Sequence, residues 1–140
     1  MIVLCMANSG DVLPLMSRDS AQGFDGETEF PITIGRTYYV YAMTFYLGIA
    51  WYYILNDDGH YWPTWTPAPM FEIIDGALPE SWQVGYFNFG REHQYPIISF
   101  PEWAEDHAFY ERLVDGDDEA VRTFQRRRRE VEAHGKSPES

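Results

Sequence analysis

The sequence predicts a mainly β protein that ends in helices, an α+β fold, and three observations carry this prediction. Twelve of the twenty-four aromatic residues lie between Tyr38 and Phe71, where aromatic and β-branched residues alternate as they do in strands. Turn residues interrupt this stretch, most clearly at Asp58-Gly59, a dipeptide typical of a hairpin. After Pro101 the apolar residues follow a helical period instead.

The N-terminal part predicts one strand and one long loop. Met1 to Ala7 is apolar, and it ends at the turn signal Asn8-Ser9-Gly10. Between residues 11 and 30 no period is sustained, so we expect a surface loop there. Within this loop we expect three apolar side chains to turn inward, namely Leu13, Leu15 and Phe24.

Six further strands are predicted from β-branched and aromatic content, with Gly, Pro, Asn and Asp between them. They are Thr37 to Tyr46, Ile49 to Leu55, His60 to Trp65, Met70 to Ile74, Trp82 to Phe89 and Tyr95 to Phe100. Pro63 indicates an edge or a bulge in the third of these, because proline cannot donate to a sheet ladder.

Two helices are predicted after the strands. In the first, Trp103, Tyr110 and Leu113 lie near one face, and Gly116 ends it. Asp117 caps the second helix, which has a thin apolar stripe at Val121, Phe124 and Val131. We expect residues 1–134 to form a single domain and residues 135–140 to be a disordered tail.

Several segments of residues 1–75, taken together, resemble a known fold family. They are a strand ending at Asn8, then Gly35-Arg36-Thr37-Tyr38-Tyr39-Val40, Asn56-Asp57-Asp58-Gly59, and Pro67-Ala68-Pro69-Met70-Phe71. Their order is similar to that of the small Src-homology-3-like barrels of bacterial and phage proteins. The resemblance implies a barrel core over residues 1–75 with a one-turn helix before its last strand, and residues 76–134 as an extension of strands and two helices.

The charge is distributed unevenly along the chain. Residues 1–120 carry four Arg against nineteen Asp and Glu, a balance of −15, and residues 121–140 carry six basic residues against three Glu, a balance of +3. The acidic body disfavours binding of nucleic acid by the globular part and favours a basic protein partner. The single cysteine, Cys5, excludes an intramolecular disulfide, and we expect a buried thiol in a cytoplasmic protein. No apolar run reaches the length of a membrane-spanning helix, so no membrane association is expected.

The aromatic strands are apolar on both faces, although a small barrel buries only its inner face. Tyr39 and Tyr41 lie on one face of their strand, while Tyr38 and Val40 lie on the other. The second face therefore needs a cover, which is the C-terminal section in the favoured interpretation and another subunit or a ligand in the alternatives.

The residues we expect to contact a partner lie around the Asp-Gly turn: Asp57, Asp58, Tyr61, Trp62 and Trp65. Exposed Tyr and Trp dominate binding hot spots. With Pro67 and Pro69, these rings also resemble an aromatic groove for proline-rich peptides, although barrel-closing residues have the same composition.

Other charged clusters carry weaker signals. Glu102, Glu105, Asp106 and His107 suggest an acid–base or metal site, but lack metal-ligand spacing, and acids are common in a first helical turn. Arg126 to Arg129 either contact a phosphate surface or pair with Glu130 and Glu132 on the same helix. We expect no cofactor, no metal and no catalytic residue.

The favoured function is a non-enzymatic, acidic protein-binding module, an inhibitor of the immunity type that neutralises a basic effector. A homo-oligomeric structural or virion protein and a metal-dependent hydrolase that uses the Glu102 to His107 cluster are the alternatives.

Overall fold

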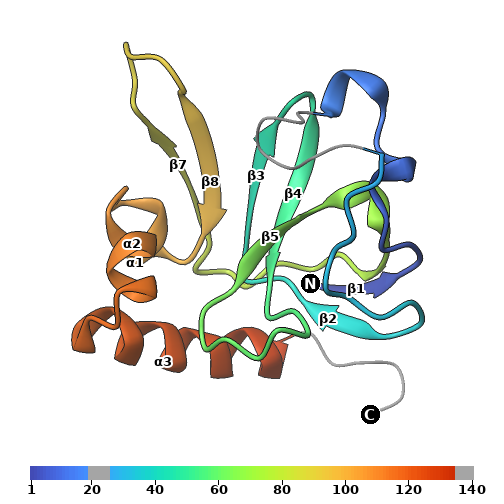
Figure 1. Ribbon diagram of the computed structural model, residues 1–140. Coiled ribbons are helices and arrows are strands. Elements are labelled where there is room, and N and C mark those ends of the chain that lie inside the picture. The colour runs from blue at the N-terminus through green and yellow to red at the C-terminus, as the bar shows by residue number, and fades with distance from the viewer. Residues whose placement is uncertain (19–25, 135–140) are drawn as a thin grey trace.

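The computed structural model describes residues 1–18 and 26–134, which form eight strands, two antiparallel sheets and C-terminal helices (Figure 1). The strands are β1 (Ile2–Cys5), β2 (Thr37–Tyr39), β3 (Ala42–Tyr46), β4 (Ile49–Ile54), β5 (Thr64–Pro67), β6 (Phe71–Asp75), β7 (Gln83–Phe87) and β8 (Tyr95–Ser99). The helices are α1 (Pro101–Ala104), α2 (Phe109–Val114) and α3 (Asp118–His134), with 3-10 turns η1 (Gly10–Val12), η2 (Leu15–Ser17) and η4 (Ala68–Met70). The mainly β prediction with C-terminal helices is confirmed.

The first sheet has three strands in the order β2-β1-β6. Its central strand β1 pairs Val3 with Tyr38 on one side and with Ile73 on the other. The one-turn helix expected before the last strand is present as η4, and it leads directly into β6.

The second sheet has five strands in the order β5-β4-β3-β8-β7. The β3–β4 hairpin turns at Leu47 and Gly48, where both residues have positive φ, as a tight hairpin turn requires. In Figure 1 the β7–β8 hairpin stands apart from the β3–β4 hairpin over most of its length.

The predicted strand from Thr37 to Tyr46 is in fact two strands that belong to different sheets. The Val40 amide donates to the Met1 carbonyl in the first sheet (3.1 Å), and the next amide, Tyr41, donates to the Tyr53 carbonyl in the second (2.9 Å). The aromatic alternation continues through this switch, which is why the sequence pattern does not mark it.

Two separate cores explain the two-sided apolar pattern. Tyr38, Val40, Tyr52 and Ile54 pack into a core that also contains Val3, Cys5 and Met70. Tyr41 packs on the opposite side, with Tyr39 and Tyr53, against residues of β7, β8 and the helices, including Ile97, Trp103, Phe109, Leu113 and Phe124. The C-terminal section therefore covers the second face, as the favoured interpretation expected.

The helices differ from the prediction in number and agree with it in position. The first predicted helix is two short helices, α1 and α2, separated at Glu105–Ala108, where the Asp106 carboxylate accepts from the Ala108 amide (2.9 Å). Asp117 caps α3 as expected, because its carboxylate accepts from the Ala120 amide at 3.0 Å. Phe124 and Val131 are buried, which confirms the apolar stripe of α3.

Some strand boundaries and buried side chains differ from the prediction. β5 runs from Thr64 to Pro67 rather than from His60 to Trp65, so residues 55–63 form a longer connection than the tight Asp58-Gly59 hairpin that the sequence predicts. In this connection the His60 ring stacks on Trp62 at 4.3 Å. Leu13 is buried as expected, whereas Leu15 is exposed. Phe24 and the expected tail at residues 135–140 lie outside the described residues.

The resemblance to Src-homology-3-like proteins implied a barrel over residues 1–75. Among the described strands, however, the sheets β2-β1-β6 and β5-β4-β3-β8-β7 do not close into a barrel.

Candidate functional site

A cleft opens in the second sheet where β8 leaves β3. The two strands pair only at Ala42 with Ser99 and at Met43 with Ile98. Beyond this point Pro96 has no amide to donate, and the Thr44 hydroxyl donates to the Pro96 carbonyl instead (2.6 Å). The ladder ends at this side-chain bond, and the two hairpins diverge above it.

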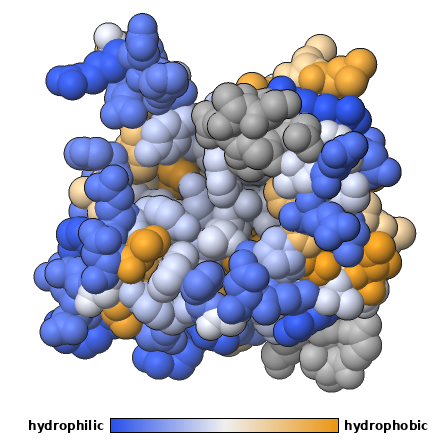
Figure 2. All heavy atoms as spheres, viewed as in Figure 1, coloured by the Kyte–Doolittle hydropathy of each residue, from blue (hydrophilic) through white to orange (hydrophobic). Residues whose placement is uncertain are grey.

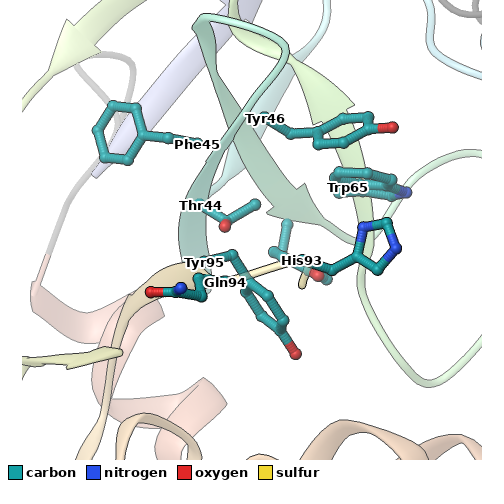
Figure 3. Close-up of a pocket in the computed structure, with 8 residues that line it drawn as sticks. Thr44, Phe45, Tyr46, Trp65, His93, Gln94 and Tyr95 are labelled. Carbon is teal, nitrogen blue, oxygen red and sulfur yellow. The ribbon is translucent and has the colours of Figure 1, made fainter. Parts of the chain in front are cut away.

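The cleft has a volume of about 390 Å³, and aromatic side chains dominate its lining. It is lined by Thr44, Phe45, Tyr46, Tyr53, Trp65, His93, Gln94 and Tyr95. Figure 3 shows Trp65 and His93 next to each other at one side, Tyr95 at another, and the Phe45 ring directed away from them. The rings come from β3, β4, β5 and β8, which are far apart in the sequence, so the cleft forms only when the chain folds.

Buried contacts hold the rings of the β3–β5 side in place. The Trp65 ring lies 4.5 Å from the ring of Trp51 and 5.4 Å from that of Tyr46. Trp51 is fully buried, and its indole N–H donates to the Tyr46 carbonyl at 2.9 Å. The aromatic wall is therefore preorganised, which lowers the entropy cost of binding.

A second cavity, of about 370 Å³, shares Tyr53 and Tyr95 with the first. It lies against the helices and includes Tyr110 and Glu111 among its lining residues. Burial raises the pKa of Tyr53 and raises that of Tyr110 to about 12. Burial and the nearby charge of Glu111 raise the pKa of Tyr95. These phenols are neutral at physiological pH and present only rings and hydroxyls.

Among the described residues the first cleft is lined by no carboxylate, and Glu111 lines only the second cavity beside it. No lysine or arginine lines either cavity within the described part of the chain, and Glu111 is the one carboxylate among the lining residues. In the view of Figure 2 most side chains at the tip of the β7–β8 hairpin and on the helices are hydrophilic, although Phe89 in that connection is 86% exposed. The faces of aromatic rings attract cations, and the only carboxylate among these described lining residues is in the second cavity.

The structure separates the five residues expected to contact a partner. Asp57 is a structural residue at its turn, because its carboxylate accepts from the Thr33 hydroxyl (2.6 Å), the Tyr38 hydroxyl (2.8 Å) and the Arg36 guanidinium (2.9 Å). Desolvation raises the pKa of Asp57, but these hydrogen bonds and the Arg36 charge outweigh it, so the pKa lies below its ordinary value. Asp58 is exposed on the same turn.

Tyr61, Trp62 and Trp65 point to three different places. The Tyr61 hydroxyl donates to the Leu113 carbonyl at the end of α2 (2.9 Å), and Trp62 packs against the core beneath the helices. Only Trp65 lines the aromatic cleft. Together with the buried Pro67, these rings do not form a common groove of the kind that binds proline-rich peptides.

Two acids of the Glu102 to His107 cluster, Glu102 and Asp106, are held by arginines. Glu102 binds Arg126 (2.7 Å) and Arg127 (2.9 Å), and Asp106 binds Arg112 (2.8 Å). Within residues 1–18 and 26–134, no group of three His, Cys, Asp or Glu side chains is placed to hold a metal ion. The hydrolase alternative stays a prediction that no observation favours.

Comparison with known proteins does not assign the chain to a family. No family model, curated protein or solved structure matches it. No helix in the described ranges is long and apolar enough to cross a bilayer. The site must therefore be interpreted from its own chemistry.

Sequence reasoning missed most of the cleft. The sequence pattern places Thr44, Tyr46 and Tyr95 in strands and His93 in a loop between two strands, and it predicts no binding role for them. Their proximity depends on the pairing of β3 with β8, which are about fifty positions apart in the sequence. Pro96 was the one local signal, since a proline inside a predicted strand indicates that pairing ends there.

Proposed function

We propose that this protein is a non-enzymatic, acidic protein-binding module that neutralises a basic protein, as an inhibitor of the immunity type does. The observation that carries the proposal is an aromatic cleft whose described lining residues include no lysine or arginine, on a chain of net charge −12. Aromatic residues supply affinity in such interfaces, and the negative field accelerates the encounter with a basic partner.

The arrangement of the arginines supports this proposal. Arg126 and Arg127 bind Glu102, and Arg128 binds Glu132 (3.0 Å), so three members of the basic run are paired with acids of the same chain. The pairing within α3 agrees with one of the two expectations for this run. It leaves an acidic body whose basic segment is largely neutralised, which disfavours nucleic acid and favours a basic partner.

We also propose a Src-homology-3-like arrangement for residues 1–75. Two features support it: the segment from Thr37 to Tyr46 contributes to both sheets, and the one-turn η4 precedes a last strand that returns to β1. The open arrangement of the two sheets is a departure from that fold.

Capture of partners from the cells that express this chain tests the function directly. The immobilised chain is expected to retain a protein rich in lysine and arginine. Calorimetry with the purified partner is expected to give an affinity that falls by about tenfold or more between about 50 and 300 mM salt, because screening weakens attraction between exposed charges. Asp58→Lys is expected to weaken binding further, since it reverses an exposed negative charge on the turn where partner contact is expected.

Glu72→Lys is the matched control, because it makes the same charge change at an exposed position of β6 in the other sheet. Equal loss in the two variants would mean that only overall charge matters. A partner of neutral or acidic composition, or an affinity that salt does not change, would contradict the proposal.

A homo-oligomer is a second candidate, and the edge strand β7 is the observation that favours it. Val84 and Tyr86 are 71% and 55% exposed, and β7 contains no charged residue or proline, which commonly protect sheet edges. In this case light scattering would give a multiple of the 16.3 kDa chain mass, and Val84→Lys would give the monomer.

A further inference from the structure

We propose that the second cavity, between the β7–β8 hairpin and the helices, binds the ammonium group of one lysine side chain of the basic partner. This inference rests on the proposed function and makes it more specific, because it names the group that is recognised and the residues that receive it. It assigns the contact to the Glu111 carboxylate and to the hydroxyls of Tyr53 and Tyr95, and so places it beside the aromatic cleft.

The second cavity has an apolar floor and a polar rim. Three buried side chains line its floor, namely Phe87, Ile97 and Trp103. Tyr53 and Tyr95 are half-buried in its walls, and Glu111 is exposed at its rim. Its volume of about 370 Å³ lies near the lower end of the range of about 300–1,000 Å³ found for small-ligand sites. The cavity is therefore suited to one side chain that enters end-on.

Glu111 supplies a negative charge that no described residue neutralises. Its carboxylate forms no ion pair within the described part of the chain, whereas the neighbouring Arg112 is paired with Asp106 (2.8 Å) and Asp117 (3.3 Å). His107 lines the cavity one helical turn earlier, with its ring edge-on to Phe87 at 6.2 Å, and it forms no ion pair with Glu111. An ammonium group that enters the cavity therefore meets an unpaired carboxylate.

Two tyrosine hydroxyls supply further acceptors. The Tyr110 hydroxyl donates to the Pro63 carbonyl (2.7 Å), whereas those of Tyr53 and Tyr95 have no hydrogen-bond partner among the described residues. No fully buried polar side-chain atom of these residues lacks a partner, so both free hydroxyls reach the cavity or solvent. In Figure 3 the Tyr95 hydroxyl points away from the Trp65 ring of the first cleft. Both hydroxyls are thus available to a ligand.

Electrostatic coupling shows that these oxygens lie near one another. Burial is the main cause of the raised pKa of Tyr95, and the negative charge of Glu111 adds to it. Burial likewise raises the pKa of Tyr53, with smaller contributions from Tyr110 and Tyr95. Because coupling weakens with distance, the carboxylate and the two hydroxyls lie around a common space. Both phenols are neutral at physiological pH and can accept hydrogen bonds from an ammonium group.

The arrangement of acceptors favours lysine over arginine. An ammonium group has three donors that can point to three separate oxygens, and its four-carbon stem can lie on the apolar floor. A guanidinium gains most from a bidentate carboxylate and an open ring face. In this cavity the Trp103 and Tyr110 rings stack on each other at 5.5 Å, and the Tyr53 ring contacts both. The rings therefore act as fixed walls, and the oxygens recognise the ligand.

Nuclear magnetic resonance with single-residue probes tests the inference. N-acetyl-lysine methylamide and its arginine and norleucine counterparts are titrated into the isotopically labelled full chain. We expect the lysine probe to shift the Trp103 indole N–H signal saturably, because Trp103 lines the second cavity and Trp65 lines only the first. We expect it to bind on the order of tenfold more tightly than norleucine, which has the same stem without the charge. Arginine is expected to bind more weakly than lysine.

Three variants locate the contact. Glu111→Gln keeps the shape and removes the charge, and we expect it to weaken the lysine probe by about tenfold. Glu105→Gln is the matched control, because it removes the same charge at an exposed position between α1 and α2 that lines neither cavity. Its effect is expected to stay within about twofold. Tyr95→Phe removes one hydroxyl and keeps the ring, and we expect it to weaken the probe by about fivefold.

The outcomes separate this inference from the proposed function. A lysine-rich peptide and a peptide with arginine at the same positions are titrated in parallel. If the lysine-rich peptide binds but the lysine probe leaves the Trp103 signal unchanged, or shifts only Trp65, the cavity inference is overturned and the function stands. If norleucine or arginine binds as tightly as lysine, or Glu105→Gln weakens binding as much as Glu111→Gln, the assignment to an ammonium group at Glu111 is overturned.

The peptides also test where the ammonium group comes from. If neither basic peptide binds at low salt, the proposed function fails, and with it the assignment to a side chain of a partner. Binding of the lysine probe in that case would show a site for small amines instead.

Discussion

Asp57 illustrates how one side chain at a turn can organise a distant loop. Its carboxylate joins Thr33, Arg36 and Tyr38 to the β4–β5 connection, and its own amide donates to the Pro31 carbonyl at 2.9 Å. The Asp-Gly turn was predictable from local chemistry, whereas these partners come from a segment 19 to 24 positions away in the sequence. Asp57, which the sequence analysis predicts to contact a partner, thus forms hydrogen bonds to residues of its own chain.

The carboxylate of Asp57 is expected to stabilise the fold in a pH-dependent way. Asp57→Asn keeps the shape but removes the charge, and we expect a loss of about 1–2 kcal/mol in the free energy of unfolding at pH 7. Because the pKa of Asp57 is lowered in the folded chain, its stabilisation is present above the ordinary aspartate pKa and is lost as the pH falls through the folded value. Urea unfolding of both proteins at neutral and acidic pH measures this difference.

The expected difference between wild type and Asp57→Asn therefore shrinks as the pH is lowered below about 4. Asp58→Asn is the control, because Asp58 is exposed on the same turn, and its effect is expected to stay within about 0.5 kcal/mol. A difference for Asp57→Asn that is the same at both pH values would show that the charge of Asp57 does not stabilise the fold.

At the scale of elements, the packing of α1 against β7 depends on one glycine. A Cβ atom at Gly85 would overlap the carbonyl oxygen of Ala104. Gly85 thus allows the helix to approach the strand, and Phe87 two positions later is buried on the side of the helices. This close approach brings Trp103 edge-on to Tyr53, with ring centres 4.8 Å apart, and both rings line the second cavity.

Gly85→Ala is expected to destabilise the protein by about 1–3 kcal/mol, because α1 must move away from β7 to admit a methyl group. Thermal unfolding followed by circular dichroism measures the effect. Gly76→Ala is the matched control, since a Cβ there would make only an ordinary contact with Ile73 at 3.6 Å. Equal stability of the two variants would contradict the close packing of α1 on β7.

Element identity was largely predictable, and element pairing was not. Periodicity and turn residues located the capped α3 and, within about two residues, every strand except β5, because these signals act over a few residues; β5 begins at Thr64 rather than His60 and extends two residues past its predicted end. The split of Thr37 to Tyr46 was missed, since the change of hydrogen-bond partner at Val40 and Tyr41 leaves the side-chain alternation intact. The cleft was missed for a related reason, because its walls meet only when β8 is placed beside β3.

At the scale of the whole molecule, the two cores share the strands between them. Tyr38 and Val40 face one core, and Tyr39 and Tyr41 face the other, so the same backbone supports both. Phe124 of α3 contacts the Tyr41 ring at 5.4 Å and thereby ties the last helix to this shared segment. We expect the cores to unfold together as the single domain predicted for residues 1–134.

Hydrogen exchange in a Phe124→Ala variant tests this cooperativity. The substitution removes a fully buried ring, with an expected cost of about 3–5 kcal/mol. If the cores form one cooperative unit, amides of β1 and of α3 lose protection by the same amount, although β1 belongs to the other core. Loss of protection confined to α3 and β8 would instead indicate two independently unfolding units.

The sequence by itself determined the mainly β class with C-terminal helices, the capped last helix, the net charge and the need to cover two apolar faces. These properties depend on side-chain periodicity, local hydrogen bonding and composition, which act over short stretches of chain. Only the tertiary structure decided what covers the second face, which candidate residues are engaged internally and where an aromatic cleft opens. Those outcomes depend on the register of β3 with β8 and on the packing of the helices, contacts between residues far apart in the chain that no local pattern encodes.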